Sequence, residues 1–141
     1  MRRHESLVPL SRFHRSILFL ALISKKNAPD VQGYPTTIEG KISYAIPFYE
    51  KKLQPHFRQE EEKLFPFIKN RHQALDRLVD ELLLERKELH LLFGELKASK
   101  NEAVLNKIGE LLEKHVRKEE RQLFQKVQEI IPGEELQKFS L

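Results

Sequence analysis

The sequence contains no cysteine, so disulfides, thiolate-bound zinc and iron–sulfur clusters are excluded. Any bound metal would have to be held by imidazole nitrogens and carboxylate oxygens. Only 5 of the 141 residues are glycine and 7 are proline, and apolar side chains recur every three or four positions rather than every second one. This shortage of turn residues, together with the helical spacing, predicts an all-α chain.

Long apolar runs are also missing. The strongest one, residues 17–23, is far shorter than the ~20 residues that span a bilayer, and the cleavage pattern of a secretory signal is absent. We therefore expect a cytoplasmic location and no membrane partner. The 25 basic and 21 acidic residues are interspersed, without the basic block typical of nucleic-acid-binding proteins, so nucleic acid is not an expected partner. A homodimer stays open.

The chain has the length of one domain, and we expect residues 1–141 to form a single one. Thr37 is a possible N-cap, whereas Pro47 and Pro55 predict that the early part of the second helix is kinked or broken. The short connections predict an up-down-up-down antiparallel four-helix bundle, in which facing core positions can hold a metal. The expected helices cover residues 9–24, 37–67, 72–97 and 102–130, with a short terminal helix at 134–139.

One motif occurs twice. The second and fourth expected helices share six residues in the pattern His-x-Arg-x-Glu-Glu-x-x-Leu-Phe, which begins at His56 and again at His115. Residues four apart lie one turn apart on the same helix face. His56 can therefore chelate a metal together with Glu60, and His115 can do so together with Glu119.

Both His–Glu pairs interrupt stripes of apolar residues that face the predicted core. An unpaired carboxylate in such a stripe is costly, so each Glu must be neutralised, paired or bound to metal. Glu61 and Glu120 lie off these faces, and we expect them to be solvated.

The other two helices carry polar residues on their core stripes as well: His14 on the first helix, and Arg86 and His90 on the third. A lone core histidine is more often hydrogen-bonded to a neighbour, but four histidines on four stripes favour a shared metal site. A buried network of the two Glu residues with Arg58, Arg86 or Arg117 is the competing interpretation. The candidate metal ligands are His14, His56, Glu60, His90, His115 and Glu119.

Three segments resemble the hemerythrin family, in its bacterial HHE cation-binding branch, and the likeness covers nearly the whole chain. They are Leu-Ser-Arg-Phe-His at 10–14, Pro-His-Phe-Arg-Gln-Glu-Glu-Glu-Lys-Leu-Phe-Pro at 55–66, and the second copy of the motif at 115–124. The resemblance implies reversible binding or sensing of O2 or NO, or a role in iron storage and homeostasis. It also implies that three histidines bind iron and two carboxylates bridge a pair of irons, namely His14, His56, His115, Glu60 and Glu119.

The third helix departs from this family, which usually has a Glu-His pair where this chain has Glu85-Arg86. His90, one turn later, occupies the place of the second histidine on that helix in the oxygen-carrying hemerythrins and is the alternative ligand. Arg86 can instead place its permanent charge between Glu60 and Glu119 and reduce the need for a cation. The site would then be altered, mononuclear or empty.

The leading hypothesis is a non-haem iron protein with a di-iron centre, because imidazole and carboxylate ligands suit iron or manganese better than calcium or magnesium. Zinc and manganese are the alternative metals. O2 or NO is the expected ligand, in an apolar pocket formed by Phe13, Phe57, Phe65 and Phe93.

No catalytic triad or phosphate-binding loop is found, so a hydrolase or kinase has no support, and an oxidase activity stays open. The second hypothesis is a metal-free helical interaction protein in which an Arg86 ion-pair network fills the site.

Overall fold

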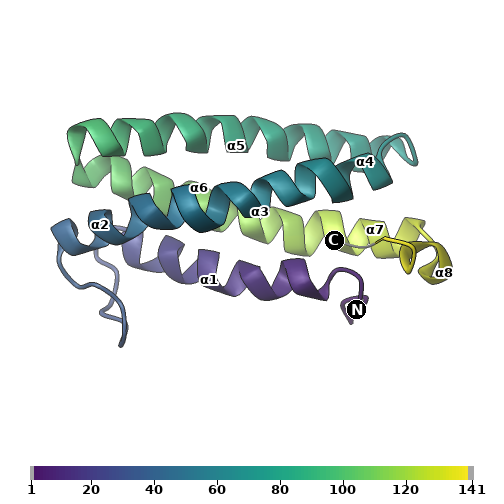
Figure 1. The fold of residues 1–141 in the computed structure, drawn as a ribbon, viewed down its shortest axis with the longest axis horizontal. Coiled ribbons are helices and arrows are strands. Elements are labelled where there is room, and N and C mark those ends of the chain that lie inside the picture. Colours follow the sequence, from purple (N-terminus) through teal and green to yellow (C-terminus); the bar gives the residue numbers. More distant parts are fainter. Residues whose placement is uncertain (1, 140–141) are drawn as a thin grey trace.

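The computed structural model describes residues 2–139, and within them four long helical rods lie side by side in alternating directions (Figure 1). The all-α up-down-up-down bundle predicted from the sequence is therefore confirmed. The first rod is α1 (Val8–Ser24) and the third is α5 (Gln73–Ser99). The second rod contains α2 (Ile38–Phe48), η1 (Tyr49–Leu53), α3 (Gln54–Gln59), η2 (Glu60–Leu64) and α4 (Phe65–Ile68). The fourth contains α6 (Glu102–Lys118), η3 (Glu119–Leu123) and α7 (Phe124–Ile130), and a short α8 (Gly133–Leu136) follows it.

The second rod is helical without interruption from residue 38 to 68, so it is not broken at its prolines. The segments η1 and η2 are π-helical turns, in which an N–H donates to the carbonyl five residues back: Gln54 to Tyr49, and Phe65 to Glu60. A proline follows each of these donors directly, at positions 55 and 66. The wider turn accommodates a residue that has no N–H to donate, and the helix continues.

Capping residues set the rod ends and keep the connections short. The Thr37 hydroxyl accepts a hydrogen bond from the Gly40 N–H at 3.0 Å, as expected for the N-cap of α2. His72 caps α5 by accepting from the Ala74 N–H. Lys100, in the left-handed conformation with φ 52°, ends α5, and the Asn101 side chain caps α6 by accepting from Ala103 N–H. With so little chain between them, α5 and α6 must run antiparallel.

The core consists of two apolar clusters, one toward each end of the bundle. Ile17, Leu89 and Leu112 belong to the first cluster, whereas Leu10, Leu82 and Leu123 belong to the second. On each rod, the residues that separate the two clusters are polar and buried. The interior of the bundle is therefore crossed by a polar layer at mid-height.

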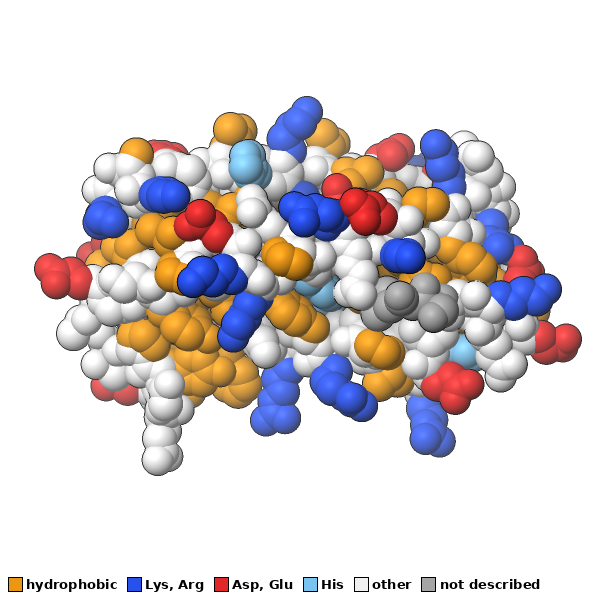
Figure 2. All heavy atoms as spheres, viewed as in Figure 1, with side chains coloured by type: hydrophobic (Ala, Val, Ile, Leu, Met, Phe, Trp, Pro, Cys, Tyr) orange, Lys and Arg blue, Asp and Glu red, His pale blue; other side chains and the backbone are white. Residues whose placement is uncertain are grey.

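The surface is mixed in charge. Figure 2 shows basic and acidic side chains scattered over the face in view, with apolar atoms gathered mainly over α1 and α2. Tyr34, in the loop before α2, stacks on Phe19 of α1 and meets the edge of Tyr44 of α2. Across residues 2–139, none of the helices combines the length and the apolar character that a membrane span requires.

Candidate metal centre

The polar layer contains the two His–Glu pairs of the repeated motif, one on the second rod and one on the fourth. Glu60 and Glu119 are almost completely buried, and the three histidines at positions 14, 56 and 115 are at most 6% exposed. Both glutamates are the first residues of π-helical turns, η2 and η3. Such turns are frequent at functional sites, because they change the direction of side chains relative to a regular helix.

Four of the candidate ligands meet at one point: His14, His56, Glu60 and Glu119 each offer a ligand atom, and these atoms all lie within 4.8 Å of one another. His14 Nε2 is 3.2 Å from Glu119 Oε1, and His56 Nε2 is 3.6 Å from Glu60 Oε1. We call these four residues the ligand cluster. The sequence prediction placed all four at the site, and the structure brings them together.

Arg86 of α5 lies beside the ligand cluster. Its Nη2 donates hydrogen bonds to Glu60 and, at 3.1 Å, to Glu119. Its Nη1 donates to Glu61 at 3.0 Å and to the carbonyl of Phe57 at 3.3 Å. The guanidinium therefore connects the two buried carboxylates, which is the ion-pair network that the sequence left open as the interpretation competing with a metal site.

His115 is buried at the edge of the layer, and both of its ring nitrogens have protein partners. Arg86 Nε donates to His115 Nε2 at 3.2 Å, so the Nδ1 atom carries the proton and donates to Glu85 at 2.9 Å. Lys118 Nζ holds the other oxygen of Glu85 at 2.8 Å. His115 thus reaches the predicted location, but Arg86 occupies the nitrogen that would face a metal.

The assignment of His90 as a ligand needs correction. Its side chain is exposed on α5, and its Nδ1 is hydrogen-bonded to the hydroxyl of Tyr49. The core positions of α5 near the layer are Arg86 and Leu89, and His90 lies one position further round the helix, toward the second rod. The periodicity placed it nearly on the core face, but Leu89 takes that place.

Glu61 is exposed, as expected from helical periodicity, whereas Glu120 is only partly exposed, and both accept hydrogen bonds from polar groups of the layer. Glu120 accepts a hydrogen bond from His14 Nδ1 at 2.8 Å, and Glu61 binds Arg86. A regular α-helix would turn the second Glu of each pair away from the layer, but each pair lies in a π-helical turn. The sequence feature that could have predicted these contacts is the second Glu, which occurs at the same position in both copies of the motif.

Comparison with protein families matches residues 10–127 to the hemerythrin HHE cation-binding domain. The chain belongs to the hemerythrin family. Comparisons with curated proteins and with solved structures give no significant match.

The four-residue cluster of this hemerythrin-family bundle has the ligand chemistry of a cation site. Within residues 2–139, three buried atoms of the cluster have no hydrogen-bond partner: His56 Nε2, Glu60 Oε2 and Glu119 Oε1. A buried polar atom without a partner destabilises the fold unless something binds it. One imidazole and two carboxylate lone pairs directed into the same space fit a cation, and imidazole with carboxylate suits iron, manganese or zinc.

The charges of the cluster interact strongly. Burial alone would lower the pKa of His14, but the carboxylates of Glu119, Glu120 and Glu60 outweigh it and raise that pKa to about 10. Burial, assisted by nearby cations, lowers the pKa of His56 to about 4. Burial and the charge of Glu119 raise the pKa of Glu60 to about 7. Burial opposes ionisation of Glu119 too, but hydrogen bonding from Glu60 and the charge of His14 lower its pKa to about 2.

The four phenylalanines predicted to line a gas pocket have different roles in this bundle. Phe57 and Phe65 contact the Arg86 guanidinium, with ring centroids 4.2 and 4.9 Å from Cζ. Phe13 stacks on His56 at 4.6 Å. Phe93 stacks on Tyr49 at 4.1 Å, in the apolar cluster away from the layer. Three of the four rings thus pack around the site, directly on its charged and ligating groups.

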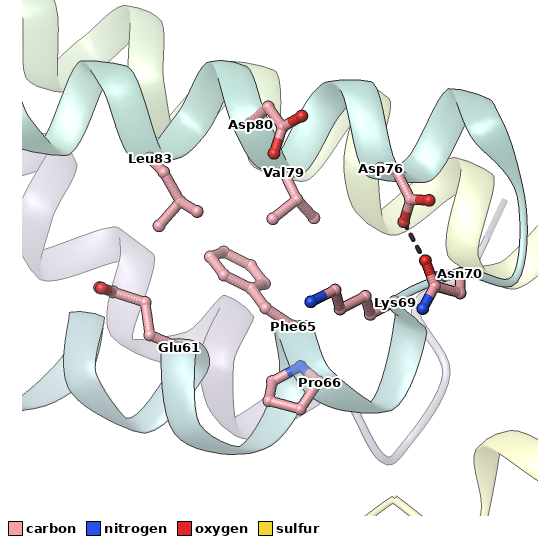
Figure 3. A pocket seen from close by; sticks show the side chains of 9 residues that line it. All are labelled: Glu61, Phe65, Pro66, Lys69, Asn70, Asp76, Val79, Asp80 and Leu83. Carbon is pink, nitrogen blue, oxygen red and sulfur yellow. Dashed lines mark hydrogen bonds between the residues drawn. The ribbon is translucent and has the colours of Figure 1, made fainter.

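A surface groove of about 570 Å³ lies between α4 and α5 (Figure 3). Val79, Leu83 and Phe65 line its apolar part, and Asp76 at one end accepts a hydrogen bond from the Asn70 N–H. Phe65 forms the boundary, since its ring borders the groove and also contacts Arg86. None of the four residues of the ligand cluster borders this groove.

Proposed function

We propose that this hemerythrin-family chain binds one metal cation, with iron as the preferred ion, through His14, His56, Glu60 and Glu119. Arg86 stands in for the second cation of a two-metal centre. Its fixed positive charge lies beside the carboxylates that would otherwise bridge two ions. The centre is thereby reduced from two ions to one.

The observation that carries this proposal is the convergence of three buried, unpartnered ligand atoms on one space. Arg86 satisfies one oxygen of each glutamate, Glu60 Oε1 and Glu119 Oε2, and leaves the other oxygen of each without a hydrogen-bond partner. Neutral His56 has an available lone pair, because its lowered pKa keeps it unprotonated at neutral pH. A cation that binds these atoms together with His14 Nε2 displaces the His14 proton, which faces Glu119 Oε1 at 3.2 Å, and needs no rearrangement of Arg86.

An iron ion bound here would supply a redox-active centre that can take a small ligand such as O2 or NO. The aromatic residues of the chain pack against the two histidine ligands of that centre. Phe13 covers His56, and Phe124 stacks on His14 with ring centroids 5.7 Å apart. Binding or sensing of O2 or NO, or a role in iron homeostasis, is the function that we propose for this centre.

Anaerobic titration of the metal-free chain with ferrous iron, followed by calorimetry, tests the proposal. The wild-type chain should bind one ion. His56→Ala removes a direct ligand, so it should weaken binding by about 100-fold or more, at least as much as the largest losses that follow removal of an outer-shell partner. His90→Ala is the matched control, because His90 is exposed and lies outside the cluster. Equal affinity in His56→Ala and the wild type would refute the ligand assignment.

A metal-free bundle is the second candidate, and charge balance favours it. At neutral pH the cationic groups Arg86 and His14 face the carboxylates of Glu60 and Glu119, so the layer is close to neutral without an ion. The same titration separates the candidates, since a metal-free interaction protein should give no binding heat with ferrous, manganous or zinc ions.

A further inference from the structure

The two Glu-Glu doublets of the motif use their second residue in the same way. The first Glu of each doublet points into the polar layer, and the second reaches the polar residue of the adjacent rod. Glu61 on the second rod accepts from Arg86 on the third, and Glu120 on the fourth rod accepts from His14 on the first. The second Glu of each motif copy therefore makes the same kind of contact, a hydrogen bond to a polar residue of a neighbouring rod, although the partner is Arg86 in one case and His14 in the other.

Glu120 is itself held in place by the segment before α1. Arg3 Nη2 donates to Glu120 Oε2 at 2.7 Å and to the Glu120 carbonyl at 2.9 Å. Gln128 fixes this segment further, by accepting from the His4 N–H at 3.0 Å and donating to the Arg2 carbonyl at 2.8 Å. The Arg3 guanidinium also lies over the ring of Phe124, whose ring stacks on His14.

These contacts define the orientation of the His14 ring. One ring nitrogen, Nδ1, donates to Glu120, so the other, Nε2, is directed toward Glu119 and Glu60 at 3.2 and 3.9 Å. A carboxylate behind the non-ligating nitrogen fixes the tautomer and the ring orientation of a metal-binding histidine and increases its basicity. His56 is oriented differently, by stacking on Phe13.

We propose that Glu120, anchored by Arg3, is a positioning residue of the metal centre that fixes His14 with Nε2 toward the ligand cluster. The inference rests on the proposed function, because it assigns Glu120 a role toward the same cation. It extends the centre beyond the residues that contact the cation, to the second Glu of the fourth-rod motif and to the segment before the first helix.

Three variants of the 141-residue chain test the role of Glu120 by anaerobic ferrous titration. Glu120→Ala should weaken binding by about 10–100-fold, the range usual for loss of an outer-shell partner. Glu120→Gln retains an acceptor oxygen for His14 Nδ1 and should recover most of that affinity. Glu62→Ala, an exposed neighbour in the other copy of the motif, should bind like the wild type. Equal losses in the Ala and Gln variants, or no loss in the Ala variant, would overturn the assignment.

A second measurement on the metal-free chain separates failure of this inference from failure of the proposed function. The imidazole 15N shifts of His14 report the hydrogen bond at Nδ1, so they should move in Glu120→Ala and stay in place in Glu62→Ala. Arg3→Gln should cause a smaller change of the same sign. If the wild type binds no ferrous iron, the metal proposal is lost, while moved His14 signals still support positioning by Glu120. Unchanged His14 signals in Glu120→Ala would overturn the inference whether or not iron binds.

Discussion

At the scale of single residues, Arg86 is the side chain that connects the polar groups of the layer by hydrogen bonds. A guanidinium is planar, permanently charged and carries five N–H donors, so it can serve several acceptors at once. Here it donates to Glu60, Glu119, Glu61, the Phe57 carbonyl and His115. A lysine ammonium offers three donors from a single atom and cannot reproduce this arrangement.

Replacing Arg86 by His should convert the centre from one ion to two. In the metal-free chain, Arg86→His removes the buried cation beside Glu60 and Glu119 and should lower the free energy of unfolding by about 3 kcal/mol. With ferrous iron, the variant should bind a second ion, because His115 Nε2 is released and a new imidazole is added. Urea unfolding and iron titration measure both effects. A destabilised variant that still binds a single ion would contradict the idea that Arg86 takes the place of a cation.

Residue types alone were sufficient to predict that His14, His56, Glu60 and Glu119 lie together in the core, because each of them interrupts an apolar stripe of its own helix. Their role as metal ligands stays a prediction. The same reasoning was wrong for His90, since a stripe drawn at 3.6 residues per turn does not separate a core position from its neighbour at the edge. Leu89 fills the core there, and His90 bonds to Tyr49 at the surface. Which of two adjacent residues turns inward depends on packing against the opposite rod, which the sequence of one helix does not contain.

At the scale of elements, the π-helical turns explain what periodicity could not predict. The predicted rods agree with the structure to within about two residues at most ends, but the second rod continues through Pro47 and Pro55 as one helix. The turns η2 and η3 begin at Glu60 and Glu119 and direct Glu61 and Glu120 to adjacent rods. Sequence patterns assume a regular helix, so a local change of winding removes the basis of the prediction.

Two glycines should respond to alanine with opposite signs. A Cβ added at Gly109 of α6 would lie 2.7 Å from the Ala21 carbonyl oxygen of α1, so the two helices must separate, at a cost of about 1–3 kcal/mol. A Cβ at Gly94 of α5 meets nothing within 4 Å, so alanine there should stabilise the helix by about 1 kcal/mol. Urea unfolding of Gly109→Ala and Gly94→Ala measures the pair. Stabilisation by both substitutions would mean that α1 and α6 do not pack as closely as described.

At the scale of the whole molecule, the polar layer divides the core and makes its stability depend on how the layer is neutralised. The clusters on either side are apolar and buried, whereas the layer contains three unpartnered polar atoms. A cation that binds only the folded chain and satisfies these atoms stabilises the fold by mass action. Binding of a cation by the ligand cluster, whose side chains come from three separate rods, would therefore be coupled to the stability of the fold.

Iron should consequently raise the melting temperature of the chain. Ferrous iron at about 100 times its Kd adds about 2.7 kcal/mol, which corresponds to roughly 5–10 °C for a domain of this size. Removal of the metal with a chelator should reverse the shift. His56→Ala, which lacks one ligand, should show little change at the same iron concentration. Anaerobic thermal melts with and without iron provide the comparison, and equal shifts in the wild type and His56→Ala would place the stabilising ion elsewhere.

The most direct test of the central claim is the number of metal ions per chain. Elemental analysis of the chain purified anaerobically from iron-supplemented cells, with protein concentration determined by amino-acid analysis, gives this number. We expect one iron per chain, because Arg86 occupies the place of the second cation and holds the nitrogen of His115 that would face it. Two irons per chain, or none after iron loading, would contradict it.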